Sequence, residues 1–139
     1  MTEFSPYLNF DGECAEAFDF YQSVLGGERF TMGADEMPPG DELGPEWEGR
    51  VVHTSLMLEG ATLMASDVPP GAELVKGNNN YVSLGVDTPE EAERVFAGLS
   101  AGGEVTMEME ETFYAHRFAE FTDKFGVCWM VLCSRGMEA

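Results

Sequence analysis

Residues 10–28, FDGECAEAFDFYQSVLGGE, contain the end of a strand, a helix and the start of the next strand. The preceding residues 4–10 alternate and carry Phe, Tyr and Leu, which is typical of a short strand that Asp11-Gly12 then interrupts. Small and apolar side chains follow at the spacing of one helical face: Cys14, Ala17, Phe18, Tyr21, Val24 and Leu25. Gly26-Gly27 is expected to end the helix, because glycine readily adopts the left-handed conformation found after helix C-termini.

The same pattern occurs a second time in the chain. A shift of 76 residues places Val86-Asp87 over Phe10-Asp11 and Gly102-Gly103 over Gly26-Gly27. The second helix has a stronger start, with Thr88 as N-cap, Pro89 at its first position and Glu91 completing a capping box. Its apolar stripe comprises Ala92, Val95, Phe96 and Leu99.

Strands are expected on both sides of each helix. In the first half they cover about 4–10, 28–33, 50–59 and 61–67, and in the second about 79–86, 104–110, 117–122 and 127–133. The sequence therefore predicts an α+β fold in which the unit βαβββ occurs twice. We expect a single domain, residues 1–139, with modules of about 1–67 and 78–134 and a loop at 68–77, because a module of about 70 residues buries little core alone.

The charge of the chain limits its partners. Its 139 residues include 26 Asp and Glu but only 7 Lys and Arg, giving a net charge of −19. Such a surface repels nucleic acid and anionic membranes, while it attracts cationic ligands. The acidic residues are spread along the chain, so a solvated surface that only favours solubility is the alternative. Three cysteines without a CxxC pair, and no apolar run as long as a membrane span, favour a cytoplasmic protein.

Three segments resemble the PhnB-like branch of the vicinal oxygen chelate (glyoxalase, bleomycin resistance, dioxygenase) superfamily. They are PYLNFDGECAEAFDFYQSVLGGE at 6–28, VHT at 52–54 with LMASD at 63–67, and TDKFGVCW at 122–129. The resemblance implies two βαβββ modules that form a curved, mostly antiparallel sheet, with helices on the convex face and a ligand on the concave face. It also implies a homodimer. Some PhnB-like proteins are labelled demethylubiquinone methyltransferases, but no Gly-rich loop for S-adenosylmethionine follows a parallel strand here.

The resemblance also implies where a metal would be held. In metal-dependent members the ligands come from the first and last strand of each module, which here places them at Pro6 or Tyr7, Met64, Tyr81 and Met130. Hard divalent cations need oxygen or nitrogen donors that these side chains supply poorly. We therefore expect no metal site and no cofactor.

Strand alternation assigns side chains to the concave face. The expected pocket consists of Tyr7, Asn9, His53, Ser55, Met57, Met64, Ser66, Tyr81, Ser83, Cys128 and Met130. Methionines and tyrosines at the former ligand positions predict an apolar, adaptable cavity with a few polar groups.

Among the titratable groups, His53 is the candidate catalytic residue, as a general base or a hydrogen-bond donor to a ligand. The structural alternative is a core histidine bonded to Ser66 or Asp67. His116 is expected in an exposed loop before the strand at 117–122, and Asp67 either caps the loop after its strand or acts as a base.

Three functions stay open at this point. The first is a small-molecule-binding protein or metal-independent enzyme of unknown substrate that uses the concave cavity. The second is a metal-dependent lyase, transferase or dioxygenase of the same superfamily. The third is a sequestering protein for a cationic drug or metabolite.

Overall fold

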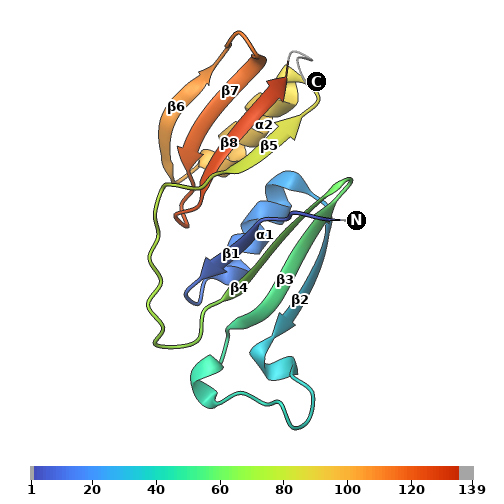
Figure 1. The fold of residues 1–139 in the computed structure, drawn as a ribbon, viewed down its shortest axis with the longest axis vertical. Helices are drawn as coiled ribbons and strands as arrows, with labels where there is room; N and C mark the ends of the chain where they lie inside the picture. The colour runs from blue at the N-terminus through green and yellow to red at the C-terminus, as the bar shows by residue number, and fades with distance from the viewer. Residues whose placement is uncertain (1, 135–139) are drawn as a thin grey trace. The chain divides into compact units, whose positions relative to one another are not determined.

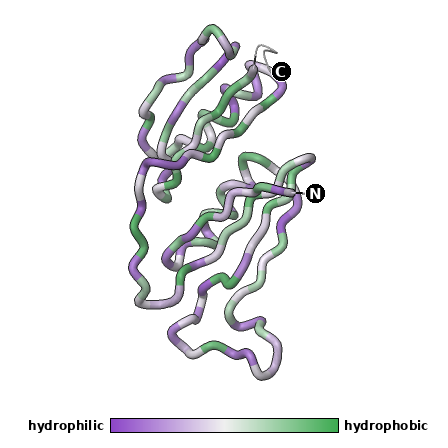
Figure 2. The backbone as a smooth tube through the Cα atoms, viewed as in Figure 1, coloured by the Kyte–Doolittle hydropathy of each residue, from purple (hydrophilic) through white to green (hydrophobic). Residues whose placement is uncertain are grey.

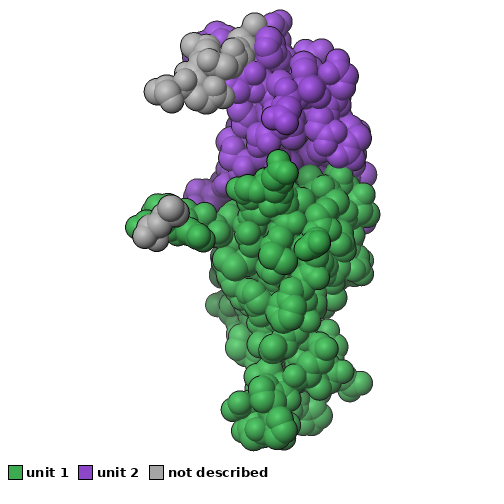
Figure 3. Space-filling view, turned by 90° about the vertical axis from the view of Figure 1, so that its right-hand side faces the viewer, with its two compact units in different colours: residues 1–75 green, residues 76–139 purple. Residues whose placement is uncertain are grey.

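A computed structural model describes residues 2–134. The chain divides into two compact units, residues 1–75 and 76–139, which Figure 3 shows in different colours. Figure 2 shows the hydropathy of each residue along the backbone. Hydrophilic and hydrophobic residues alternate along most of residues 104–110, and buried and partly exposed side chains alternate along 63–67, so these strands have one face suited to a core.

Unit 1 is one βαβββ module (Figure 1). Its elements are β1 (Tyr7–Phe10), α1 (Cys14–Leu25), β2 (Glu28–Gly33), β3 (Val51–Leu58) and β4 (Ala61–Asp67), with two short 3-10 helices, Ala34–Glu36 and Pro45–Trp47, between β2 and β3. The four strands form a sheet in the order β1-β4-β3-β2. Only β1 and β4 run parallel, so the sheet is mostly antiparallel.

Unit 2 repeats this arrangement. Its elements are β5 (Val82–Val86), α2 (Pro89–Ser100), β6 (Glu104–Glu110), β7 (Ala115–Thr122) and β8 (Cys128–Ser134). The sheet order β5-β8-β7-β6 is that of unit 1, again with one parallel pair, β5 and β8. The predicted α+β class with two βαβββ modules is confirmed, and its strands form two four-stranded sheets, one in each unit.

Three predicted element bounds and one predicted helix cap differ from the structure. The first strand begins at Tyr7 rather than residue 4, and β5 begins at Val82 rather than 79. Pro6 has no N–H to donate to a strand partner, and residues 78–80 are asparagines, which favour turns. His116 lies inside β7, not in a loop before it. The Thr88 hydroxyl accepts a hydrogen bond from the Glu91 N–H at 3.1 Å, but the Glu91 carboxylate pairs with Arg94 instead of completing the capping box.

In each unit the helix packs on one face of the sheet. In unit 1 the core between them consists of Phe10, Cys14, Ala17, Phe18, Tyr21, Leu56, Leu63 and Ala65, all buried. In unit 2 the corresponding core contains Ala92, Val95, Leu99, Ala119, Phe121, Trp129, Val131 and Cys133. In the part of the chain that the structure describes, the opposite face of each sheet carries no helix of its own unit.

Asp67 joins three parts of unit 1 at the end of β4. One carboxylate oxygen accepts hydrogen bonds from the N–H groups of Gly12 (2.7 Å) and Cys14 (3.1 Å), and the other accepts one from the Val51 N–H (2.8 Å). The side chain is buried, so these bonds link the start of α1 and the start of β3 to β4. These contacts support the structural alternative for Asp67 rather than the role of a base.

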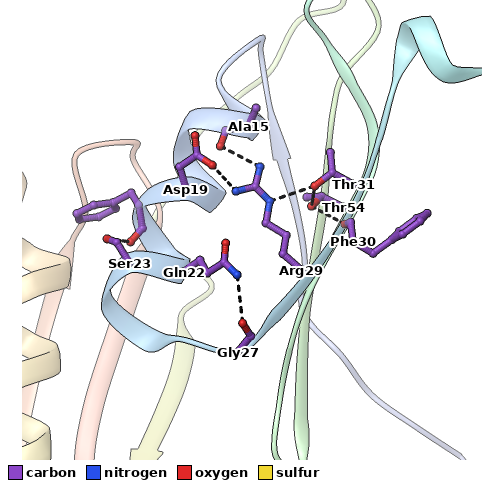
Figure 4. Close-up of polar contacts among 10 residues, drawn as sticks. Ala15, Asp19, Gln22, Ser23, Gly27, Arg29, Phe30, Thr31 and Thr54 are labelled. Atoms are coloured by element: carbon purple, nitrogen blue, oxygen red, sulfur yellow. Dashed lines mark hydrogen bonds and ion pairs between the residues drawn. The ribbon is translucent and has the colours of Figure 1, made fainter.

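Arg29 holds α1 against β2 on the same side of the sheet (Figure 4). Its guanidinium pairs with Asp19 and donates to the Ala15 carbonyl, while its Nε donates to the Thr31 hydroxyl at 3.1 Å. The Thr31 hydroxyl in turn shares a 2.8 Å hydrogen bond with Thr54 on β3. Polar groups on the helix side of this sheet are thus bound to one another.

Asp123 organises the turn between β7 and β8 in unit 2. One carboxylate oxygen accepts from the N–H groups of Phe125 (2.8 Å) and Val127 (3.0 Å), and the other accepts from the Trp129 indole N–H (2.9 Å). The predicted role of Asp123 as a turn residue is confirmed, and the indole contact adds a link to the core.

Replacing Asp67 with asparagine tests its structural role. The amide nitrogen cannot accept a hydrogen bond, so at least one buried N–H loses its partner, and we expect a loss of about 3 kcal/mol in the free energy of unfolding. Urea denaturation measures this loss. Asp87→Asn, the same change at an exposed site, is the control and should cost less than about 0.5 kcal/mol. Equal stability of the two variants would contradict the role assigned to Asp67.

Candidate functional site

The face of the unit 1 sheet that α1 does not cover carries most of the predicted site. We call it the helix-free face of unit 1; it comprises Tyr7, Asn9, Glu28, Phe30, Met32, His53, Ser55, Met57, Thr62, Met64 and Ser66. Strand pairing sets Tyr7 beside Met64, Met64 beside Ser55, and Ser55 beside Phe30, which gives one row across all four strands. Three large side chains on this face are well exposed: Tyr7 at 45%, Phe30 at 50% and Met57 at 43%.

His53 lies in the next row of this face. Met32 is its partner on β2, and because Thr54 pairs with Ala65, His53 lies beside Ser66 on β4. The Tyr7 hydroxyl and His53 Nδ1 are 3.2 Å apart, within hydrogen-bonding distance, and the two ring centroids are 5.8 Å apart. The half-buried imidazole therefore contacts a residue of the helix-free face rather than the core under α1.

The predicted residues separate by unit. Tyr7, Asn9, His53, Ser55, Met57, Met64 and Ser66 share the helix-free face of unit 1. In unit 2, Ser83 pairs with Met130, and the Cys128 thiol lies 3.7 Å from the Thr122 hydroxyl on the neighbouring strand. Tyr81 precedes β5 and is 37% exposed.

Sequence reasoning missed Glu120, which lies in the middle of the corresponding face of unit 2. Strand pairing places Ser83 beside Met130, Met130 beside Glu120, and Glu120 beside Met107. Alternation along 115–122 would have indicated this position, because Phe118, Glu120 and Thr122 share a face while Ala119 and Phe121 pack into the core.

An open hollow of about 500 Å³ lies in unit 1 beside the turn between β3 and β4. Its lining residues are Glu3, Phe4, Ser5, Met57, Leu58, Gly60, Ala61 and Thr62. Of the predicted pocket residues only Met57 belongs to it, so this hollow and the Tyr7–His53 pair occupy different parts of the sheet.

The thiol of Cys14 is poorly suited to chemistry. Burial, with the nearby Asp67 charge as a second cause, raises the pKa of Cys14 from its ordinary 9.0 to about 12. Thiols react as thiolates, so this side chain stays protonated and unreactive near neutral pH. It acts as a small core residue at the start of α1.

The donors at the implied metal positions do not fit a hard divalent cation. Met64 and Met130 offer thioether sulfur, and they pair with Tyr7 and Ser83 respectively. Within residues 2–134 no group of three or more His, Cys, Asp or Glu side chains is placed to hold a metal ion. We therefore derive no chemical step through a metal.

None of the helices in the described part of the chain is long and apolar enough to cross a membrane.

The two βαβββ modules are consistent with the superfamily whose model the sequence matches. A model of the Glyoxalase/Bleomycin resistance protein/Dioxygenase superfamily matches residues 4–131, so the chain belongs to this superfamily. Within it the chain belongs to the PhnB-like branch, as its individual relatives indicate.

Three relatives are similar over nearly the whole chain. Protein YjdN of Escherichia coli (strain K12) is 35% identical over 138 residues, covering 91% of this chain and 92% of YjdN. The crystal structure of protein PA1353 from Pseudomonas aeruginosa has 40% identity and a TM-score of 0.87, covering 96% of this chain and 98% of the other. A PhnB protein from Bacillus cereus, named as a putative 3-demethylubiquinone-9 3-methyltransferase, has 26% identity and a TM-score of 0.72, covering 96% of this chain and all of its own.

The raised pKa of Cys14 predicts a change in alkaline stability. Between the ordinary pKa of 9.0 and about 12, the unfolded chain loses the Cys14 proton while the folded chain keeps it. Unfolding then releases a proton, so stability falls as pH rises above about 9. Urea denaturation of Cys14→Ala should show a shallower fall between pH 9 and 11 than the wild type. Comparing each protein with its own stability at pH 7 removes the cost of the lost side chain, and equal slopes would contradict the raised pKa.

Proposed function

We propose that this protein binds a small organic molecule on the helix-free face of unit 1, without a metal. The observation that carries the proposal is the Tyr7–His53 pair, which presents two polar rings on a sheet face alongside exposed Phe30 and Met57. Exposed apolar side chains grouped around a few polar groups are typical of ligand sites.

The chemistry of this face suits a mostly apolar ligand with one hydrogen-bonding group. The thioethers of Met57 and Met64 adapt their shape to a ligand, and the ring of Phe30 offers a flat surface. The His53 imidazole can form a hydrogen bond to a ligand through its second ring nitrogen, while the Tyr7 hydroxyl lies 3.2 Å from Nδ1. If the bound molecule is also transformed, His53 is the proposed proton acceptor or donor.

We do not propose for this chain the methyltransferase activity that the name of the Bacillus cereus relative states. A methyltransferase needs a loop that holds its methyl donor, and such loops in nucleotide-binding folds are glycine-rich. The loop after β1, the strand with a parallel neighbour in unit 1, is Asp11-Gly12-Glu13 and contains one glycine.

A second candidate function is sequestration of a cationic molecule. The net charge of −19 supports it, because a strongly acidic protein raises the local concentration of cations. Attraction by net charge weakens as salt rises. Binding that falls steeply between 50 mM and 500 mM NaCl would favour this function, and binding that is insensitive to salt would favour the first.

Substituting the histidine tests the proposed site. A library of small neutral and charged molecules, screened by ligand-observed NMR, should yield binders whose affinity falls about 10-fold or more in His53→Ala, because a buried polar contact contributes about 1.5 kcal/mol. His116→Ala is the matched control, since it removes the other histidine from an exposed position on β7.

The outcome depends on both variants. Binding lost in His53→Ala and kept in His116→Ala, with unchanged thermal unfolding, supports the site. Binding that survives in His53→Ala once its fold is verified would make His53 a structural residue and overturn its assignment.

We also propose that the protein is a cytoplasmic homodimer. Each sheet ends in two edge strands, which proteins usually cover or pair, and Phe4 before β1 is 95% exposed. The three cysteines are unpaired and buried, as in proteins of reducing compartments.

Sedimentation equilibrium at micromolar concentration tests the assembly. We expect a mass of two chains, because a second copy would cover apolar edge residues such as Phe4. Phe4→Ser should then weaken association, while Glu59→Ser in the exposed turn after β3 should not. A monomer at every concentration would contradict the dimer.

A further inference from the structure

The two units align residue by residue across their sheets. The row Tyr7, Met64, Ser55, Phe30 in unit 1 has its counterpart in Ser83, Met130, Glu120, Met107 in unit 2. A methionine occupies the same place on the last strand of both rows. The central difference is that unit 2 has a carboxylate where unit 1 has the Ser55 hydroxyl.

The neighbouring row on one side extends the comparison. His53 in unit 1 corresponds to Phe118 in unit 2, and Ser66 corresponds to Leu132. Glu120 therefore has Met107, Met130 and Phe118 beside it in the register, and the hydroxyl of Thr122, which lies 3.7 Å from the Cys128 thiol, is on its other side along β7. Both sheets carry acidic residues on their outer strand, Glu28 on β2 and Glu104 and Glu110 on β6, but on this face only unit 2 has one on an inner strand.

Glu120 is also uncompensated within its unit. Among residues 2–134 its half-buried carboxylate has neither a hydrogen-bond nor an ion-pair partner, whereas Arg117 on the same strand pairs with Glu93 of α2. A carboxylate among apolar side chains has no structural benefit in a chain that already carries −19. Its position favours recognition of a group that supplies positive charge.

We propose that Glu120 is a specificity-determining residue that binds the ammonium or amidinium group of a ligand, while Met107 and Met130 contact the apolar part of that ligand. This inference goes beyond the proposed function, because it assigns a ligand class to the corresponding face of unit 2 rather than to the helix-free face of unit 1. It differs from attraction by net charge, since it depends on one carboxylate rather than on all 26 acidic residues.

A pair of probes of equal size tests the inference. Phenethylammonium and 2-phenylethanol share a phenyl ring and differ in one terminal group, which is charged in the first. Their affinities are measured in the full chain from the methyl signals of Met107, Met130 and Met64 in ¹³C-methionine NMR. Phenethylammonium should shift the Met107 and Met130 signals and bind about 5-fold more tightly than the alcohol, the upper range for a partly exposed ion pair.

Two variants separate the local carboxylate from the overall charge. Glu120→Gln keeps the shape of the side chain and should remove the preference for the ammonium probe. Glu90→Gln makes the same change in net charge in the first turn of α2, on the other side of the sheet, and should preserve the preference. Thermal unfolding of both variants verifies their folds.

Three results would overturn the inference. They are equal affinity for the two probes, a preference that survives in Glu120→Gln, and a preference lost to the same extent in Glu90→Gln. Failure of the proposed function is a separate result: the library would then yield no binder that depends on His53, whatever the probes do at Met107 and Met130.

Discussion

Within the described residues, each sheet in this protein is covered by a helix of its own unit on one face only, and the rest of the structure depends on that constraint. With four strands and one 12-residue helix per unit, side chains that alternate along a strand divide into a buried set and a set without helix cover. Leu56, Leu63 and Ala65 pack under α1. Because side chains alternate along each strand, His53, Ser55 and Met64 lie on the other side. Packing of the core therefore determines which side chains form the candidate site.

Polar side chains on the helix side are committed to structure. Asp67 accepts hydrogen bonds from three backbone N–H groups, and Arg29 binds polar groups of α1 and β2. Such groups are stable in a core because every donor and acceptor has a partner. Among residues 2–134, the His53 imidazole has a hydrogen-bond partner in Tyr7, whereas the Glu120 carboxylate has none. This contrast separates the groups that hold the fold from those available to a ligand.

The sequence was sufficient for the order of the elements and for most of their bounds. Three sequence patterns each predict one type of element, and the structure has that element there. They are the helical spacing from Cys14 to Leu25, the helix start at Thr88-Pro89 and the strand pattern in 51–67. Prediction was weaker where local preference and pairing compete. Pro6 and the asparagines at 78–80 shorten two strands, and Glu91 prefers the nearby Arg94 to the N-cap backbone. Glu120 was missed because its importance arises from pairing with Met107 and Met130, which lie 13 and 10 residues away in the chain.

The central claim is that a small molecule binds on the helix-free face of unit 1, beside Tyr7 and His53. Intermolecular nuclear Overhauser effects between a bound library ligand and the methyl groups of this protein test it most directly. The account predicts contacts from the ligand to the Met64 methyl and to the His53 ring, and none to Leu56 or Leu63 under α1. Contacts confined to Ala61 and Thr62 in the hollow beside the β3–β4 turn, or to the side of the sheet that α1 covers, would contradict it.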